Sequence, residues 1–135
     1  MPHLSKRRLK FQTQQELIKS LQVVFAKISS LQETDSFLDS LLSDTEKLML
    51  AKRLGIVVLL KEKIAESTIA NILNVTRETV ARQRYHMESK SEGYNLAIKK
   101  LDGEKLLQGF KKLLLSLARY SARAAGGRVK PGILD

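Results

Sequence analysis

The stretch IANILNVTRETVARQR, residues 69–84, decides how this chain folds. Its apolar start is typical of the end of a buried helix. Its second half carries Arg77, Arg82 and Arg84 at spacings typical of a helix face. The segment 74–76 separates the two halves, so the stretch is either two helices joined by a tight turn or one basic surface helix.

The residues around position 74 satisfy each requirement of a turn between two helices. Helices that cross steeply need a small residue at their contact, and Ala70 supplies it. The turn needs a residue with a positive φ. Apart from glycine, asparagine adopts this conformation most readily, and Asn74 lies at this position. Thr76 can cap the second helix, and Val75 fills the angle. We therefore predict a helix-turn-helix built by Ile69, Ala70, Leu73, Asn74, Val75 and Val80.

A helix-turn-helix inserts the start of its second helix into the major groove of DNA. Arginine can read guanine there through two hydrogen bonds. The predicted contacts to double-stranded DNA are Thr76, Arg77, Glu78, Thr79, Ala81, Arg82, Arg84 and Tyr85, with Lys6, Arg7 and Arg8 of a basic arm. An ordinary pair of helices with a solvated basic face remains the alternative. Gln83 favours that alternative, because this position of the motif usually points inward and is usually apolar.

Helical spacing dominates the rest of the chain, and only 7 of 135 residues are glycine, so we predict an all-α fold. Residues 1–12 form a flexible basic arm. A capping box at Thr13–Glu16 opens a helix that ends near residue 32, and a short helix covers about 37–42. A second capping box, Ser43–Glu46, opens a helix that ends near residue 62.

The second half of the chain is predicted to hold four helices. They cover residues 66–73, 76–88, 94–101 and 104–125. A polar break at 89–93 separates the middle pair, and Asp102-Gly103 ends the third helix. Residues 124–135 are predicted to form a frayed tail.

The helix over residues 44–62 has apolar residues nearly all round, so most of its sides require burial. A second subunit is the simplest source of that burial, and we expect a homodimer. A central helix in a monomeric bundle is the alternative.

The chain has 24 basic and 14 acidic residues, a net charge of +10, which is typical of proteins that bind a polyanion. It has no cysteine and only 2 histidines, and it carries no glycine loop, metal cluster or nucleophile motif, so we expect neither an enzyme nor a metal site. We expect a cytoplasmic protein, because the basic start lacks the apolar segment of a secretory signal and no apolar run is long enough to span a bilayer.

The last predicted helix is both apolar and cationic. Its apolar face comprises Leu106, Leu107, Phe110, Leu113, Leu114, Leu117 and Ala118. Its basic stripe comprises Lys105, Lys112, Arg119 and Arg123. Such a helix can bind a membrane surface or pack its leucines on the protein core, and we favour the packing.

Several of these segments together resemble the Trp repressor family, and most closely its Trp-repressor-like branch. They are LMLAKRL at 48–54, LLKE at 59–62, TVAR at 79–82, LLS at 41–43 and EGY at 92–94, with Ile69, Leu73 and Val75. The resemblance covers about residues 14–101. It implies an intertwined all-helical homodimer whose two recognition helices enter successive major grooves, about 34–36 Å apart.

The resemblance also bears on the ligand. The two arginines that flank tryptophan in the repressor match Arg53 and Arg82. The glycine that follows the second arginine is replaced by Gln83, whose side chain would occupy the space of the indole ring. We therefore expect no tryptophan and no other cofactor, and we expect Arg53 to be structural, paired with an acid. A second departure is Ala65, where the branch tends to carry a capping Ser or Thr.

We thus divide the chain into an arm (1–12), a Trp-repressor-like domain (13–102, with the helix-turn-helix at 66–88) and an extra C-terminal helix with its tail (103–135). The predicted function is that of a sequence-specific DNA-binding regulator, a repressor, acting as a dimer. The alternative is a nucleic-acid-binding protein without sequence preference, either nucleoid-associated or RNA-bound.

Overall fold

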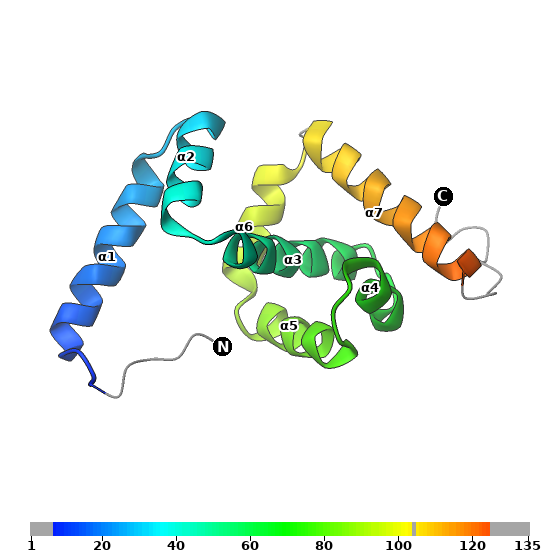
Figure 1. Ribbon diagram of the computed structural model, residues 1–135, viewed down its shortest axis with the longest axis horizontal. Helices are drawn as coiled ribbons and strands as arrows, with labels where there is room; N and C mark the ends of the chain where they lie inside the picture. Colours follow the sequence, from blue (N-terminus) through cyan, green and yellow to red (C-terminus); the bar gives the residue numbers. More distant parts are fainter. Residues whose placement is uncertain (1–6, 104, 125–135) are drawn as a thin grey trace. The chain divides into compact units, whose positions relative to one another are not determined.

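The computed structural model describes residues 7–103 and 105–124, without the side chains of 106, 107, 118 and 120–124. The predictions for Lys6, Arg123 and the tail therefore lie outside the described residues or side chains. The described residues form α-helices and no strands, which confirms the all-α prediction (Figure 1). The chain divides into two compact units, Met1–Lys47 and Leu48–Asp135.

The first unit contains α1 (Phe11–Lys27) and α2 (Leu31–Leu41). The rings of Phe25 and Phe37 meet edge to face, with their centroids 5.3 Å apart. Neither helix has a buried residue, although α1 is rich in large apolar side chains. The first unit therefore leaves its apolar surface uncovered.

The predicted start and end of the first helix are wrong. Helix α1 begins at Phe11 after Lys10, without a side-chain cap, and Thr13 lies inside its first turn. The Gln14 side chain donates to the Leu9 carbonyl at 2.8 Å and holds this earlier start. The helix ends at Lys27 because Ser30 caps α2, accepting a hydrogen bond from the Glu33 amide.

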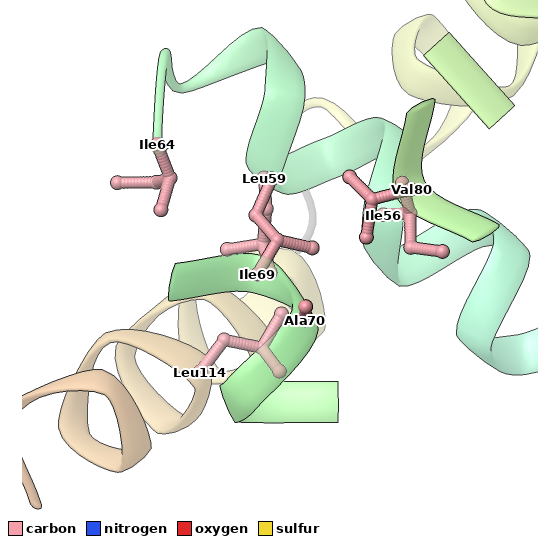
Figure 2. Close-up of a cluster of buried hydrophobic side chains, with 7 residues drawn as sticks. All are labelled: Ile56, Leu59, Ile64, Ile69, Ala70, Val80 and Leu114. Atoms are coloured by element: carbon pink, nitrogen blue, oxygen red, sulfur yellow. The ribbon is translucent and has the colours of Figure 1, made fainter. Parts of the chain in front are cut away.

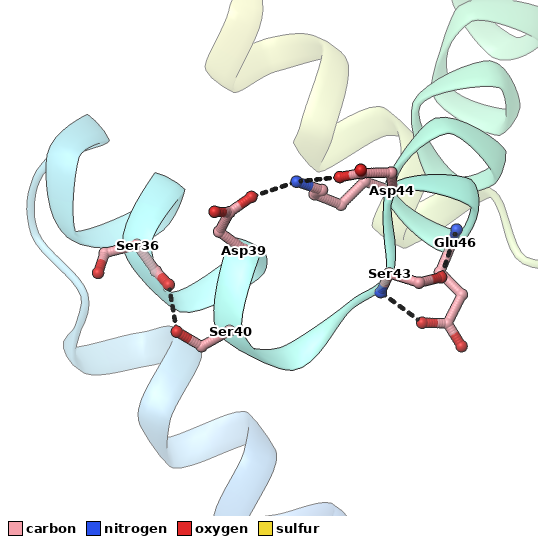
Figure 3. A network of polar contacts seen from close by, with 7 residues as sticks. Ser36, Asp39, Ser40, Ser43, Asp44 and Glu46 are labelled. Atoms are coloured by element: carbon pink, nitrogen blue, oxygen red, sulfur yellow. Dashed lines mark hydrogen bonds and ion pairs between the residues drawn. The ribbon is translucent and has the colours of Figure 1, made fainter.

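The capping box predicted at Ser43 is present at the start of α3 (Asp44–Lys61). The Ser43 amide donates to the Glu46 carboxylate at 2.8 Å, and the Glu46 amide donates to the Ser43 hydroxyl at 3.2 Å (Figure 3). Lys47 forms ion pairs with Asp39 and with Asp44. Its hydrogen bond is the main reason that the pKa of Asp39 lies below its usual range. These contacts connect the end of α2 with the first turn of α3.

The second unit contains most of α3, α4 (Glu66–Leu73), α5 (Arg77–Ser89), α6 (Ser91–Leu101) and α7 (Lys105–Ala124). Helix α4 packs on both α5 and α7, and α5 packs on α6 (Figure 1). The buried cluster takes residues from four of these helices and the α3–α4 loop (Figure 2): Ile56, Leu59, Ile64, Ile69, Ala70, Val80 and Leu114.

Helix α3 changes character along its length. Residues 56–59 are all buried, and four consecutive positions cover nearly the whole circumference of a helix. This confirms all-round burial for the second half. The first half instead exposes Leu48, Met49 and Leu50, each by more than 40%.

The polar break predicted at 89–93 is wrong, because a single residue, Lys90, separates α5 from α6. Its amide donates to the His86 carbonyl at 2.8 Å and its φ of −129° turns the chain. Gly93 lies in the first turn of α6. The predicted end holds, since Asp102 caps α6 and Gly103 has a φ of 83°.

Candidate nucleic-acid interface

The turn between α4 and α5 is centred on Asn74, which adopts the left-handed conformation with φ 52° and ψ 55°. The Val75 amide closes the turn on the Ala70 carbonyl at 3.0 Å. Ala70 is buried, and Val75 is half-buried against the core cluster. An asparagine there costs less than a residue with a larger or branched side chain.

Thr76 caps α5. Its hydroxyl accepts from the Thr79 amide at 3.1 Å and lies 2.8 Å from the Thr79 hydroxyl. Both threonines are exposed. The start of α5 thus presents amide groups and the positive end of the helix dipole to solvent, an arrangement that favours phosphate.

The exposed face at the start of α5 contains most of the predicted DNA contacts. Arg77, Glu78, Arg82 and Tyr85 are exposed, whereas Ala81, predicted to face outward, is half-buried. Arg82 forms an ion pair with Glu78 at 3.0 Å, and both side chains are more than half exposed. An exposed pair of this kind contributes about 0–1 kcal/mol, so DNA can take Arg82 from Glu78 at little cost.

Arg84 has a different place from the other arginines. It forms an ion pair with Glu66, the first residue of α4. This contact joins the two helices of the helix-turn-helix. Helix α4 has no side-chain cap at Ala65. The negative charge of Glu66 in its first turn therefore also stabilises the helix, through a favourable interaction with the helix dipole.

Gln83 points into the protein. Only 6% of its surface is exposed, and its Nε2 donates a hydrogen bond to the hydroxyl of Tyr94 in α6. The sequence indicated that this position faces inward but gave no sign of the partner, which is eleven residues away on another helix. The bond connects the recognition helix with α6.

Arg53 is exposed on α3. Within the part of the chain that the structure describes, it has no ion-pair partner, so the expected pairing with an acid is wrong. The second arginine of the predicted ligand pair, Arg82, interacts with Glu78 instead.

The N-terminal arm contributes Arg7 and Arg8, which are both exposed just before α1. Lys6 lies outside the described residues. Because the arm belongs to the first unit, its contact with DNA stays a prediction.

The described helices include none that is long and apolar enough to cross a membrane. Nor do the described side chains bring three or more potential metal ligands together.

The sequence matches the model of a known protein family. A family model described as Trp repressor protein matches residues 12–102, about two thirds of the chain. Neither the curated proteins nor the solved structures gave a match.

Proposed function

Because this chain belongs to the Trp repressor family, whose members are helix-turn-helix DNA-binding regulators, we propose that it is a sequence-specific repressor that binds operator DNA as a homodimer. The observation that carries the proposal is the start of α5. The capped helix end presents Arg77 and Arg82 on an exposed face beyond the Asn74 turn. We further propose that the protein is cytoplasmic and binds DNA there.

The homodimer is supported by the uncovered apolar surface. Seven large apolar residues of α1 are each more than 40% exposed, namely Phe11, Leu17, Ile18, Leu21, Val23, Val24 and Phe25. In the second unit, Leu48, Met49 and Leu50 of α3 are also exposed, each by more than 40%. Exposed large apolar side chains in such numbers are typical of protein interfaces. A second copy of the chain offers the same self-complementary surface.

Selection of bound sites from fragmented genomic DNA with the purified protein tests sequence specificity. Enrichment of a few fragments that share two half-sites about one helical turn apart supports the proposal. Equal recovery of all fragments contradicts it and favours the general nucleic-acid binder, whose support is the net charge of +10. Competition by single-stranded RNA distinguishes an RNA-bound form, although the chain has only 5% aromatic residues for base stacking.

Substitutions separate base reading from backbone attraction. Arg77→Ala and Arg82→Ala should each narrow the affinity difference between operator and random duplex, by about 1–3 kcal/mol if the arginine reads a guanine. Arg7→Ala with Arg8→Ala should weaken operator and random duplex by the same factor. Arg84→Ala is compared on the same helix, and because Arg84 pairs with Glu66 of α4 we expect it to change the preference for operator less than Arg77→Ala does.

The dimer is tested by light scattering coupled to size exclusion. The wild-type mass should be twice 15.2 kDa, and Leu21→Glu should lower it by placing a charge on the exposed apolar face of α1. A monomeric wild-type protein at micromolar concentration would contradict the homodimer.

We also propose that tryptophan is not the effector. Gln83 supports this, because its buried side chain is already hydrogen-bonded to Tyr94. Calorimetric titration of the DNA-free protein with tryptophan should show no saturable heat, and millimolar tryptophan should not change operator affinity.

A further inference from the structure

Helix α7 follows the region matched by the family, which ends at residue 102, and it is anchored to the helix-turn-helix. Leu114 is 4% exposed and belongs to the same buried cluster as Ile69 and Ala70 of α4 (Figure 2). Phe110 lies against Gly55 of α3, where an added Cβ would stand 3.6 Å from its ring. These contacts place α7 against α4 as a fixed part of the second unit.

The charge of α7 is of one sign. The helix has no acidic residue and five basic ones: Lys105, Lys111, Lys112, Arg119 and Arg123. Lys111 forms an ion pair with Glu62, the residue that follows the end of α3. Lys105, Lys112 and Arg119 are exposed. Since they repeat every seven residues, they share one face, about 21 Å long at 1.5 Å per residue.

Lys105 also stands at an unfavourable position for the helix itself. It is the first residue of α7, where a positive charge opposes the helix dipole, and the first turn contains no acid to offset it. In the described part of the chain neither Lys105 nor Lys112 has an ion-pair partner. Within the described residues, these two charges therefore form no ion pair that would stabilise the fold.

We propose that the basic face of α7, formed by Lys105, Lys112 and Arg119, binds backbone phosphates of the DNA duplex that the helix-turn-helix holds, beyond the base pairs that α5 reads. The inference rests on the proposed function. The charge of the face complements a polyanion, and its anchoring on α4 keeps it at the DNA-binding unit. Phosphate contacts carry no sequence information, so this face raises affinity for operator and random duplex alike.

The observations favour DNA over an anionic membrane. A helix that lies in a membrane surface inserts its apolar face, and the cationic face only assists. In α7 that apolar face is already used, because Leu114 is buried and Phe110 and Leu115 pack against the core cluster. Among the described side chains, only Leu113 and Leu117 remain as exposed large apolar residues of the helix.

The test uses the full chain with Lys105→Gln and Lys112→Gln together. The matched control is Lys99→Gln with Lys100→Gln, which removes two exposed lysines from α6. Duplex affinity is measured from about 50 to 200 mM salt by fluorescence anisotropy, on operator and on random sequence. Log affinity falls as log salt rises, and each lost phosphate contact makes this slope shallower by about 0.9. The slope of the α7 variant should therefore be shallower than that of wild type by about 1.8. The factor by which wild type binds duplex more tightly than the variant should therefore become about tenfold smaller between the lowest and the highest salt.

The outcomes separate the two proposals. An unchanged slope in the α7 variant, or an equal change in the α6 control, contradicts phosphate binding by α7. If wild type still binds operator in that case, the proposed function is retained. A wild-type protein that binds no duplex refutes the proposed function itself. Flotation of wild type with anionic vesicles, lost in the α7 variant while duplex affinity is unchanged, assigns the face to a membrane and overturns the proposal. Thermal unfolding followed by circular dichroism confirms that both variants are folded.

Discussion

Replacing Tyr94 by phenylalanine isolates the hydrogen bond that joins the recognition helix to α6. The change removes only the hydroxyl that accepts from Nε2 of Gln83. It leaves a polar donor on a residue that is 6% exposed, without its partner. An unpaired buried donor costs about 1–3 kcal/mol. Because Tyr94 is half-buried and water can approach its side of the bond, we expect about 1–2 kcal/mol in the free energy of unfolding.

The matched variants distinguish this bond from simple packing. Gln83→Leu removes the donor and leaves a half-buried hydroxyl that water can satisfy, so it should cost less than Tyr94→Phe. In the double variant both polar groups are gone, and the stability lost in Tyr94→Phe should largely return. The coupling between the two sites should therefore be about 1 kcal/mol in the stabilising direction.

Urea unfolding followed by circular dichroism measures these differences. All variants are compared at one protein concentration, because stability depends on concentration if the chain dimerises. Two results would refute the reasoning. One is a Tyr94→Phe protein within a few tenths of a kcal/mol of wild type. The other is a double variant as unstable as Tyr94→Phe alone.

Three further predictions concern local structure. Asn74→Gly should leave the free energy of unfolding within about 0.5 kcal/mol of wild type, whereas Asn74→Ala should lower it by about 1 kcal/mol, because φ is 52° there; urea unfolding of both variants decides it. Thr76→Ala should cost about 1 kcal/mol through loss of the cap, with Thr76→Ser retaining most of it in the same assay. The carboxyl pKa of Asp39, measured by NMR titration, should lie below its usual range and return to it in Lys47→Met. A lowered carboxyl pKa stabilises the fold above the unfolded pKa, and this contribution disappears as the pH falls through the folded pKa; an unchanged pKa in the variant would contradict the pairing.

The features predicted correctly from sequence depend on residues close together in the chain. The box at Ser43–Glu46 and the left-handed Asn74 each follow from the hydrogen bonds or dihedral angles of a few neighbours. The false box at Thr13 failed for the same local reason, because Gln14 reaches back to Leu9 and starts α1 earlier. Competing local contacts, rather than propensity alone, decided which cap formed.

The features that sequence reasoning missed depend on contacts between helices. Glu66 and Arg84 lie on the two helices of the helix-turn-helix, and Gln83 forms a hydrogen bond with Tyr94 on a third helix. Helical periodicity indicates which way a side chain points but not which polar group it will find. All three arginines of α5 are exposed, and the ion pairs of Arg82 with Glu78 and of Arg84 with Glu66 became visible only in the structure.

The burial pattern also bears on how DNA binding would depend on concentration. The first unit, Met1–Lys47, has helices without a single buried residue, and units of about this size seldom fold on their own core. In the proposed homodimer, the second copy would supply the surfaces on which α1 and α2 pack. Folding of α1 and α2 would thus be coupled to dimerisation. Below the dimer dissociation constant, the protein would lose both the N-terminal helices and the paired recognition helices, so operator occupancy should rise more steeply than linearly with protein concentration.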